Sequence, residues 1–177
     1  NAPESLLDTI RAAGVDFLTL ANNHMLDRYF EGMLTTVDQV DQWGFDYGGA
    51  YRTPEEAATP VVVEVNGVNI GFLCYTAHTN GMERYCDAGA TEYGISYLKD
   101  ADFAADVEAL KAAGAEFIIC LPHWGTEYQR RPDADVRQTA LKMAEAGIDV
   151  ILGSHPHMVQ PMEWLEVDTP QGPRRTL

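Results

Sequence analysis

Positively charged residues are scarce in this sequence. It contains 12 lysine and arginine residues against 27 aspartate and glutamate residues, for a formal net charge of −15 over 177 residues. Nucleic-acid-binding proteins present a basic surface to the phosphate backbone, and here the acidic residues are spread along the whole chain. The composition therefore argues against nucleic acid as a partner. An anionic substrate would need a local positive charge, which a bound metal ion supplies.

Long apolar runs and paired cysteines are also lacking. No run of about 18 apolar residues occurs, so the sequence contains no candidate transmembrane segment. The three cysteines, Cys74, Cys86 and Cys120, show no C-x-x-C spacing, and their odd number argues against a disulfide framework. Cys74 and Cys120 stand in apolar runs and are expected in the core. The apolar fraction of 46% is typical of a globular domain.

One pattern occurs three times, at residues 6–24, 107–125 and 140–157. Each copy begins with apolar residues at helical spacing and then reaches an Ala-Gly pair, whose glycine (Gly14, Gly114 or Gly147) is an expected helix stop. A short apolar strand follows, at residues 17–20, 117–121 and 150–152. This alternation predicts an α/β fold in which helices cover a mostly parallel sheet.

Further elements are predicted between these units. Residues 31–43 read as a helix followed by a short segment at 45–47, and Thr53 with Pro54 opens one helical turn. Residues 61–75 form a hairpin around Asn66-Gly67, the preferred pair for a type I′ turn. Residues 76–96 read as a long loop, 99–113 and 132–146 as helices, and 162–167 as the start of further strands. The sheet is therefore expected to be mixed.

Histidine is rare, and four of the five histidines follow the strands of the repeated units. Parallel strands bring their carboxyl ends to one edge, so His24, His123, His155 and His157 are predicted to meet there. Neutral imidazole is a common ligand of zinc and transition metals. An extended His-x-His segment points both rings to one side, and the intervening proline favours extended geometry at His155. Taken alone, this segment fits two ordinary loop histidines equally well.

Other polar residues near these histidines have two readings each. Glu127, four residues after His123, is either an acceptor for a histidine N–H or a solvated carboxylate. Asn23 can offer its amide oxygen to a metal, or it belongs to a plain turn that Asp27 caps or orients. His78 has no companion and is interpreted as a loop residue, with a substrate contact as the lesser alternative.

The segments "ANNHMLD", "LPHWGTEY" and "GSHPHMVQP" together resemble the signature segments of bacterial capsule-synthesis, or poly-gamma-glutamate biosynthesis, proteins of the CapA type. That family belongs to the calcineurin-like metallophosphoesterase superfamily. The three motifs match in order and spacing, and the resemblance covers nearly the whole chain. It implies a four-layer α/β/β/α sandwich with mixed sheets, incomplete at both termini. Residues 1–177 would then be a single domain that lacks the N-terminal strand and the C-terminal strands.

The resemblance also implies a function, a metal-dependent phosphoesterase-like domain acting in capsule or poly-gamma-glutamate synthesis. The alternative is a non-catalytic subunit of a membrane-associated polymer synthesis or export complex that retains the fold. A phosphorylated or polyanionic substrate, other synthesis subunits and an extracytoplasmic location, with any membrane anchor outside this chain, are the associated expectations.

The resemblance also assigns roles to individual residues, at the positions of this sequence that match the family's motifs. His24 matches a catalytic residue that contacts the phosphate and protonates the leaving group. The expected cofactor is one or two divalent ions of manganese, iron or zinc, which polarise phosphoryl oxygens and lower the pKa of a bridging water. In the superfamily, acidic metal ligands come from an N-terminal strand and a second acidic motif, and nothing before Asn23 resembles either. A second difference is Ser154, where family members often carry histidine. The implied metal ligands are Asn23, His123, His155 and His157.

Overall fold

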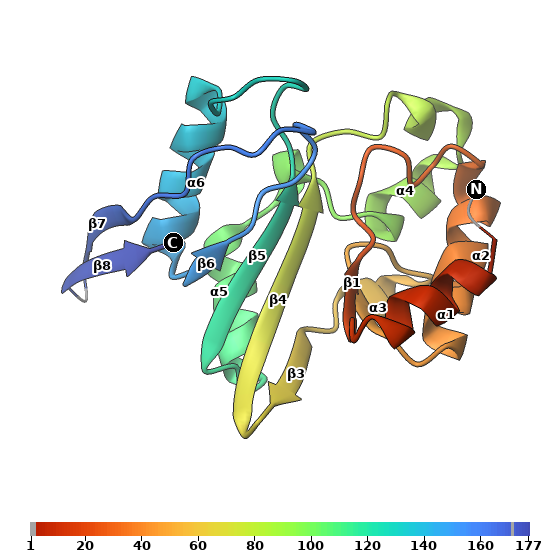
Figure 1. The fold of residues 1–177 in the computed structure, drawn as a ribbon, viewed down its shortest axis with the longest axis horizontal. Helices are drawn as coiled ribbons and strands as arrows, with labels where there is room; N and C mark the ends of the chain where they lie inside the picture. The colour runs from red at the N-terminus through yellow and green to blue at the C-terminus, as the bar shows by residue number, and fades with distance from the viewer. Residues whose placement is uncertain (1–2, 171) are drawn as a thin grey trace.

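The computed structural model describes residues 3–170 and 172–177 as a mixed α/β fold (Figure 1). Its largest sheet has the strand order β3-β4-β5-β6. Strand β3 (Val61–Val65) runs antiparallel to β4 (Val68–Thr76), and β5 (Phe117–His123) and β6 (Val150–Ile151) continue the sheet in parallel. The predicted mixed sheet is confirmed. Because β4, β5 and β6 are parallel, their carboxyl ends share one edge.

Local signals in the sequence are well reproduced. Asn66 and Gly67, between β3 and β4, have φ values of 53° and 84°, as a type I′ turn requires. Helix α3 (Pro54–Ala57) begins after Thr53, whose hydroxyl accepts from the Glu56 N–H at 3.2 Å. The glycines at the three predicted helix stops have φ values of 81°, 97° and 110°.

Helices α5 (Phe103–Ala112) and α6 (Ala134–Ala146) share a core with one face of the large sheet. Ile118 and Cys120 of β5 are buried in this core, where they meet Val107 and Leu110 of α5. The hairpin of β7 (Leu165–Thr169) and β8 (Gly172–Thr176) packs on α6. In Figure 1 this hairpin and α6 lie at the β6 side of the sheet.

The first repeated unit is not part of the large sheet, contrary to the expectation from unit spacing that all three units share one sheet. Strand β1 (Phe17–Thr19) pairs in parallel with β2 (Asp46–Gly48) in a separate two-stranded ladder. The Phe17 ring stacks on Phe72 of β4, with centroids 4.0 Å apart, so this ladder packs against the large sheet. Helices α1 (Ser5–Ala12) and α2 (Tyr29–Gln42) complete a second core around β1 and β2. Side-chain packing, which strand spacing does not reveal, decides this arrangement.

The loop predicted at residues 76–96 contains helical structure, which corrects that prediction. A 3₁₀ turn, η1 (Met82–Tyr85), is followed by α4 (Ala88–Gly94), which Asp87 caps by accepting from the Ala90 N–H at 3.1 Å. The α4 sequence has two glycines and no apolar periodicity. It is held by packing, because the Phe30 ring of α2 meets Tyr93 edge to face at 6.2 Å.

Two predicted helix starts lie too early in the sequence. Asp102 caps α5 through the Ala105 N–H at 3.1 Å, so the helix begins at Phe103, after a separate 3₁₀ turn, η2 (Leu98–Asp100). Asp133 likewise precedes α6 in extended geometry. Nowhere in residues 3–170 and 172–177 is a helix long and apolar enough to cross a membrane.

Gly49 should be the glycine least able to accept a side chain. It has a φ of 91°, and an added Cβ would lie 2.5 Å from the Ala21 Cβ and 2.9 Å from the Cys74 Cβ. We expect Gly49→Ala to lower the free energy of unfolding by about 3 kcal/mol, since overpacking adds to backbone strain.

Gly114→Ala is the matched control, because Gly114 has a similar φ of 97° and open space around it. It should cost only about 1–2 kcal/mol, from backbone strain alone. Urea unfolding of both variants measures the difference, and equal losses would show that β2 and the Ala21 loop are not closely packed.

Candidate metal centre

Loops at the carboxyl ends of the strands bring the histidines together. His78 follows β4, His123 ends β5, and His155 and His157 follow β6. The ring centroids of His123 and His78 lie 4.8 Å and 5.3 Å from that of His155, and the His155 and His157 centroids are 6.2 Å apart. We call these four residues, with His24 from the loop after β1, the histidine rim.

Asn23 joins the first loop to β5 from a buried position. Its Oδ1 lies 2.9 Å from the His123 Nε2, and its Nδ2 donates to Asn80 Oδ1 at 3.4 Å. An amide oxygen can only accept, so neutral His123 carries its proton on Nε2 and its Nδ1 accepts from the Ser154 hydroxyl at 2.9 Å. Ser154 thus orients the His123 ring.

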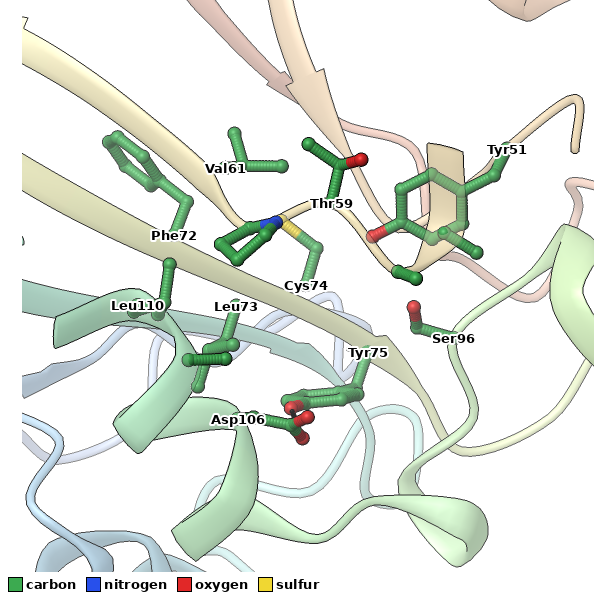
Figure 2. Close-up of a pocket in the computed structure, with 14 residues that line it drawn as sticks. Tyr51, Thr59, Val61, Phe72, Leu73, Cys74, Tyr75, Ser96, Asp106 and Leu110 are labelled. Carbon is green, nitrogen blue, oxygen red and sulfur yellow. Dashed lines mark hydrogen bonds between the residues drawn. The ribbon is translucent and has the colours of Figure 1, made fainter. Parts of the chain in front are cut away.

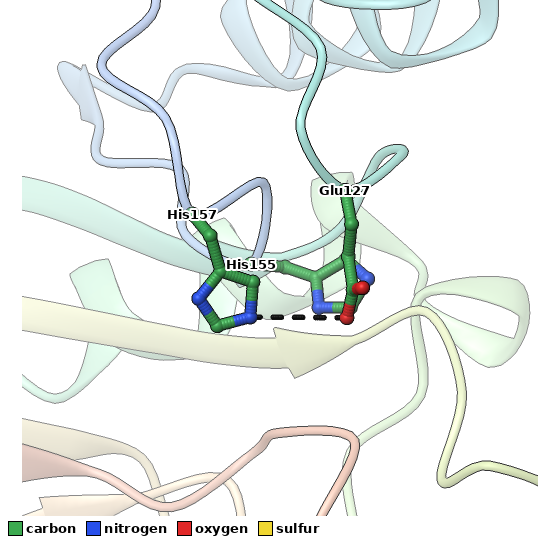
Figure 3. Close-up of side chains that lie close together, drawn as sticks. All are labelled: Glu127, His155 and His157. Atoms are coloured by element: carbon green, nitrogen blue, oxygen red, sulfur yellow. Dashed lines mark ion pairs between the residues drawn. The ribbon is translucent and has the colours of Figure 1, made fainter.

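Glu127 forms a compact group with His155 and His157 (Figure 3). Each of the three offers a ligand atom, and these atoms lie within 4.8 Å of one another. The Glu127 Oε1 is 3.7 Å from the His157 Nε2. The sequence predicts this carboxylate either as an acceptor for a histidine N–H or as a solvated group. The structure places it beside His155 and His157, where it can be a ligand itself.

The backbone at the histidine pair differs from the extended geometry predicted for it. His155 has a φ of 96° and His157 a φ of 55°. Pairing with β5 ends at Ser154, whose N–H donates to the Pro122 carbonyl at 2.9 Å, and the chain then turns. Non-glycine residues in such conformations cost about 1–3 kcal/mol each and concentrate at functional sites. The turn after Ser154, rather than an extended His-Pro-His segment, therefore sets the direction of the two rings.

Two of the rim histidines are held in the neutral form. Burial, followed by the like charges of His155 and the other rim histidines, lowers the pKa of His123 from 6.5 to about 4. Burial and then His78 lower the pKa of His155, against a smaller opposing effect of Glu127. Neutral imidazole is the form that binds a metal ion.

These residues fit a divalent metal ion. The donor set of imidazole, amide and carboxylate suits zinc, manganese or iron. His155 Nδ1 is buried without a hydrogen-bond partner among the described residues, an arrangement that costs about 1–3 kcal/mol and that a bound ion or water would relieve. His123 can turn Nε2 to an ion while its Nδ1–H donates to Ser154, the usual arrangement of a metal-binding histidine.

His24 stands at the outer side of the rim. Its Nδ1 lies 2.8 Å from Asp27 Oδ2, and both side chains are exposed. Asp27 therefore orients the His24 ring. His24 also contributes to the lowered pKa of His123 and of His155, so it is close enough to act on them electrostatically.

Sequence reasoning missed His78 as a member of the rim. Residues 61–75 read as an antiparallel hairpin, a pattern that does not predict a parallel neighbour for its second strand. In the structure β4 is also the parallel neighbour of β5, and Thr76 pairs with His123. His78 is two residues beyond that pair, which brings it to the same edge. The available signal was a histidine two residues after the end of the apolar run of β4.

A small cavity of about 120 Å³ lies along β4, between α3 and α5 (Figure 2). Cys74, Tyr75 and Asp106 are among its lining residues, and the Tyr75 hydroxyl donates to Asp106 at 2.6 Å. Burial raises the pKa of Asp106 and raises that of Cys74 to about 12. Because these groups are paired or kept protonated, the cavity is a weaker candidate site than the rim.

Comparisons with known proteins point to one family. The chain matches the family model described as bacterial capsule synthesis protein PGA_cap over residues 1–174. The capsule biosynthesis protein CapA of Bacillus anthracis is 31% identical over 163 residues, which are 90% of this chain and 39% of that protein. The PGA biosynthesis protein CapA of Bacillus subtilis is 31% identical over 147 residues, 82% of this chain and 38% of that protein.

A more distant relative has a related name. A probable polyglutamine synthesis accessory protein of Mycobacterium tuberculosis is 28% identical over 154 residues, which are 81% of this chain and 40% of that protein. The chain spans about two fifths of the length of the three relatives.

His123 should make the stability of the metal-free protein depend on pH. Its pKa is about 4 when folded and near 6.5 when unfolded, so the unfolded chain binds the proton first as the pH falls. We expect the free energy of unfolding to decrease from about pH 6.5 towards pH 4. His123→Asn should be less stable at neutral pH but show a shallower dependence between pH 6.5 and 5. Urea unfolding in the presence of a chelator measures both slopes, and identical slopes would contradict this assignment.

Proposed function

The chain belongs to the bacterial capsule synthesis protein PGA_cap family, and we propose that its histidine rim is a metal-dependent phosphoesterase-like site. The site would act on a phosphorylated or polyanionic substrate during capsule or poly-gamma-glutamate synthesis, outside the cytoplasm. The observation that carries this proposal is the group formed by Glu127, His155 and His157, next to a buried His155 nitrogen that has no partner among the described residues.

The ligand roles follow from the contacts. His155, His157 and Glu127 offer donor atoms on one side, and Asn23 and His123 offer a second pair 2.9 Å apart. A divalent ion bound there would polarise a phosphoryl oxygen and lower the pKa of a coordinated water. The two groups of donor atoms could each hold one ion, or together hold a single ion.

His24 is the proposed proton donor. The Asp27 carboxylate can only accept, so the His24 Nδ1–H donates to it at 2.8 Å, which fixes the ring and leaves Nε2 as the other ring nitrogen for a substrate. From Nε2, the proton would pass to the oxygen of the leaving group as its bond to phosphorus breaks. The exposure of His24 suits a residue that meets a substrate arriving from solvent.

The four-layer sandwich is part of the same proposal. Stacking of Phe17 on Phe72 joins the β1-β2 ladder to the large sheet, and each has helices in its own core. This packing supports two sheets face to face with helices outside.

The second candidate is a non-catalytic subunit of a polymer synthesis complex that retains this fold. The word "accessory" in the name of the mycobacterial relative favours it. Such a subunit would keep the rim without turning over a phosphoester, which the two experiments below distinguish.

Metal binding is the first test. After loading with zinc or manganese and extended dialysis, the wild-type chain should retain about one or two ions, measured by elemental analysis. The double variant His155→Ala/His157→Ala should lose them, and Glu127→Gln should weaken binding at least about tenfold, because a ligand charge is removed. Glu64→Ala, exposed on β3 at the opposite end of the sheet, is the control. Equal metal content in all proteins would refute the metal centre.

Hydrolysis of bis(p-nitrophenyl) phosphate by the metal-loaded chain tests catalysis. His24→Asn should reduce kcat by about 10²–10⁴ with unchanged metal content, as expected for loss of a general acid. A metal-bound wild type with no turnover would favour the non-catalytic subunit.

A further inference from the structure

His78 belongs to the histidine rim but has no role in the metal centre proposed above. Its ring meets the His155 ring edge to face, with centroids 5.3 Å apart and planes at 82°. The side chain is exposed, and it lies outside the Glu127–His155–His157 group. The position of His78 at the rim, outside the proposed ligand group, therefore raises the question of its own role.

The loop that carries His78 is firmly held. The hydroxyl of Thr76, a fully buried residue, donates to the His78 carbonyl at 2.8 Å, and the Ala77 N–H donates to the His123 carbonyl at 2.9 Å. Thr79, also fully buried, contacts Glu83 at 2.6 Å and the Tyr97 hydroxyl at 2.9 Å. Buried hydroxyls on both sides of His78 therefore fix its backbone relative to β5.

The tautomer of His78 is set within the same loop. The Asn80 N–H donates to the His78 Nδ1 at 3.3 Å, so Nδ1 carries the lone pair and the neutral ring carries its proton on Nε2. No acceptor for this Nε2–H is found in the part of the chain that the structure describes. Asn80, with a φ of 54°, also accepts from Asn23 through its side chain. The loop thus connects a free N–H donor to a proposed metal ligand.

We propose that His78 is an anion-binding residue of the rim, whose Nε2–H donates to an oxygen of a phosphoryl group. This inference rests on the proposed function, because that function places the phosphoryl group at the rim. Donation rather than metal ligation follows from the tautomer, since Asn80 occupies the only lone pair of the neutral ring. In a chain of net charge −15, such a donor adds selectivity for anions without a further ion.

Two variants test the N–H donor of His78 separately from its aromatic ring. His78→Phe keeps an aromatic ring against His155 but removes the N–H, whereas His78→Gln keeps an N–H at about the reach of Nε2. The probe is inorganic phosphate, titrated calorimetrically into zinc-loaded protein. His78→Phe should weaken phosphate binding about tenfold or more, and His78→Gln should stay within about threefold of wild type. With bis(p-nitrophenyl) phosphate, His78→Phe should raise KM more than it lowers kcat.

Elemental analysis of the same samples identifies which proposal fails. Phosphate affinity unchanged in His78→Phe, or zinc-loaded wild type that binds no phosphate, would overturn the anion role while the metal centre stands. Zinc lost from His78→Phe would also overturn it, since His78 would then support the metal. If the wild type takes up no metal, the metal centre is refuted. Phosphate binding that still depends on the N–H at residue 78 would then support the anion site by itself.

Discussion

The parallel register of β4, β5 and β6 is the constraint on which the rest of the site depends. Thr76 pairs with His123, and His123 forms a bridge with Ser154. These pairs bring the residues that follow each strand to one edge of the sheet. Side chains alternate between faces along a strand, so a shift of one residue would turn His123 away from the rim. The ladder hydrogen bonds and the buried Ile118 and Cys120 of β5 oppose such a shift.

The rim concentrates features that oppose folding. It holds His123 and His155 neutral by burial and mutual repulsion, gives His155 and His157 positive φ values, and leaves a buried His155 nitrogen without a partner among the described residues. Each of these lowers stability when no ligand is bound. A bound divalent ion would use the lone pairs of the neutral imidazoles and give the nitrogen a partner. Their coincidence at one sheet edge is the physical basis for a metal centre here.

Local patterns were the most predictable part of the molecule. The helix-Gly-strand units, the turn at Asn66-Gly67 and the Thr53 cap depend on residues close in sequence, and the structure has all of them. Helix α4 was missed because its stability comes from Phe30 and Tyr93, which are far apart in the chain. Strand β1 was assigned to the wrong sheet for a similar reason, since the stacking of Phe17 on Phe72 is a contact between sheets.

The sequence by itself determined the α/β units, the family and the presence of histidines at several strand ends, because periodicity, caps and motifs are local properties. Only the tertiary structure decided how those loops meet. It places Glu127 beside His155 and His157, adds His78 to the rim and gives Ser154 a partner in His123. Strand register and packing between sheets set these contacts, and both depend on residues up to about a hundred positions apart, such as Asn23 and His123.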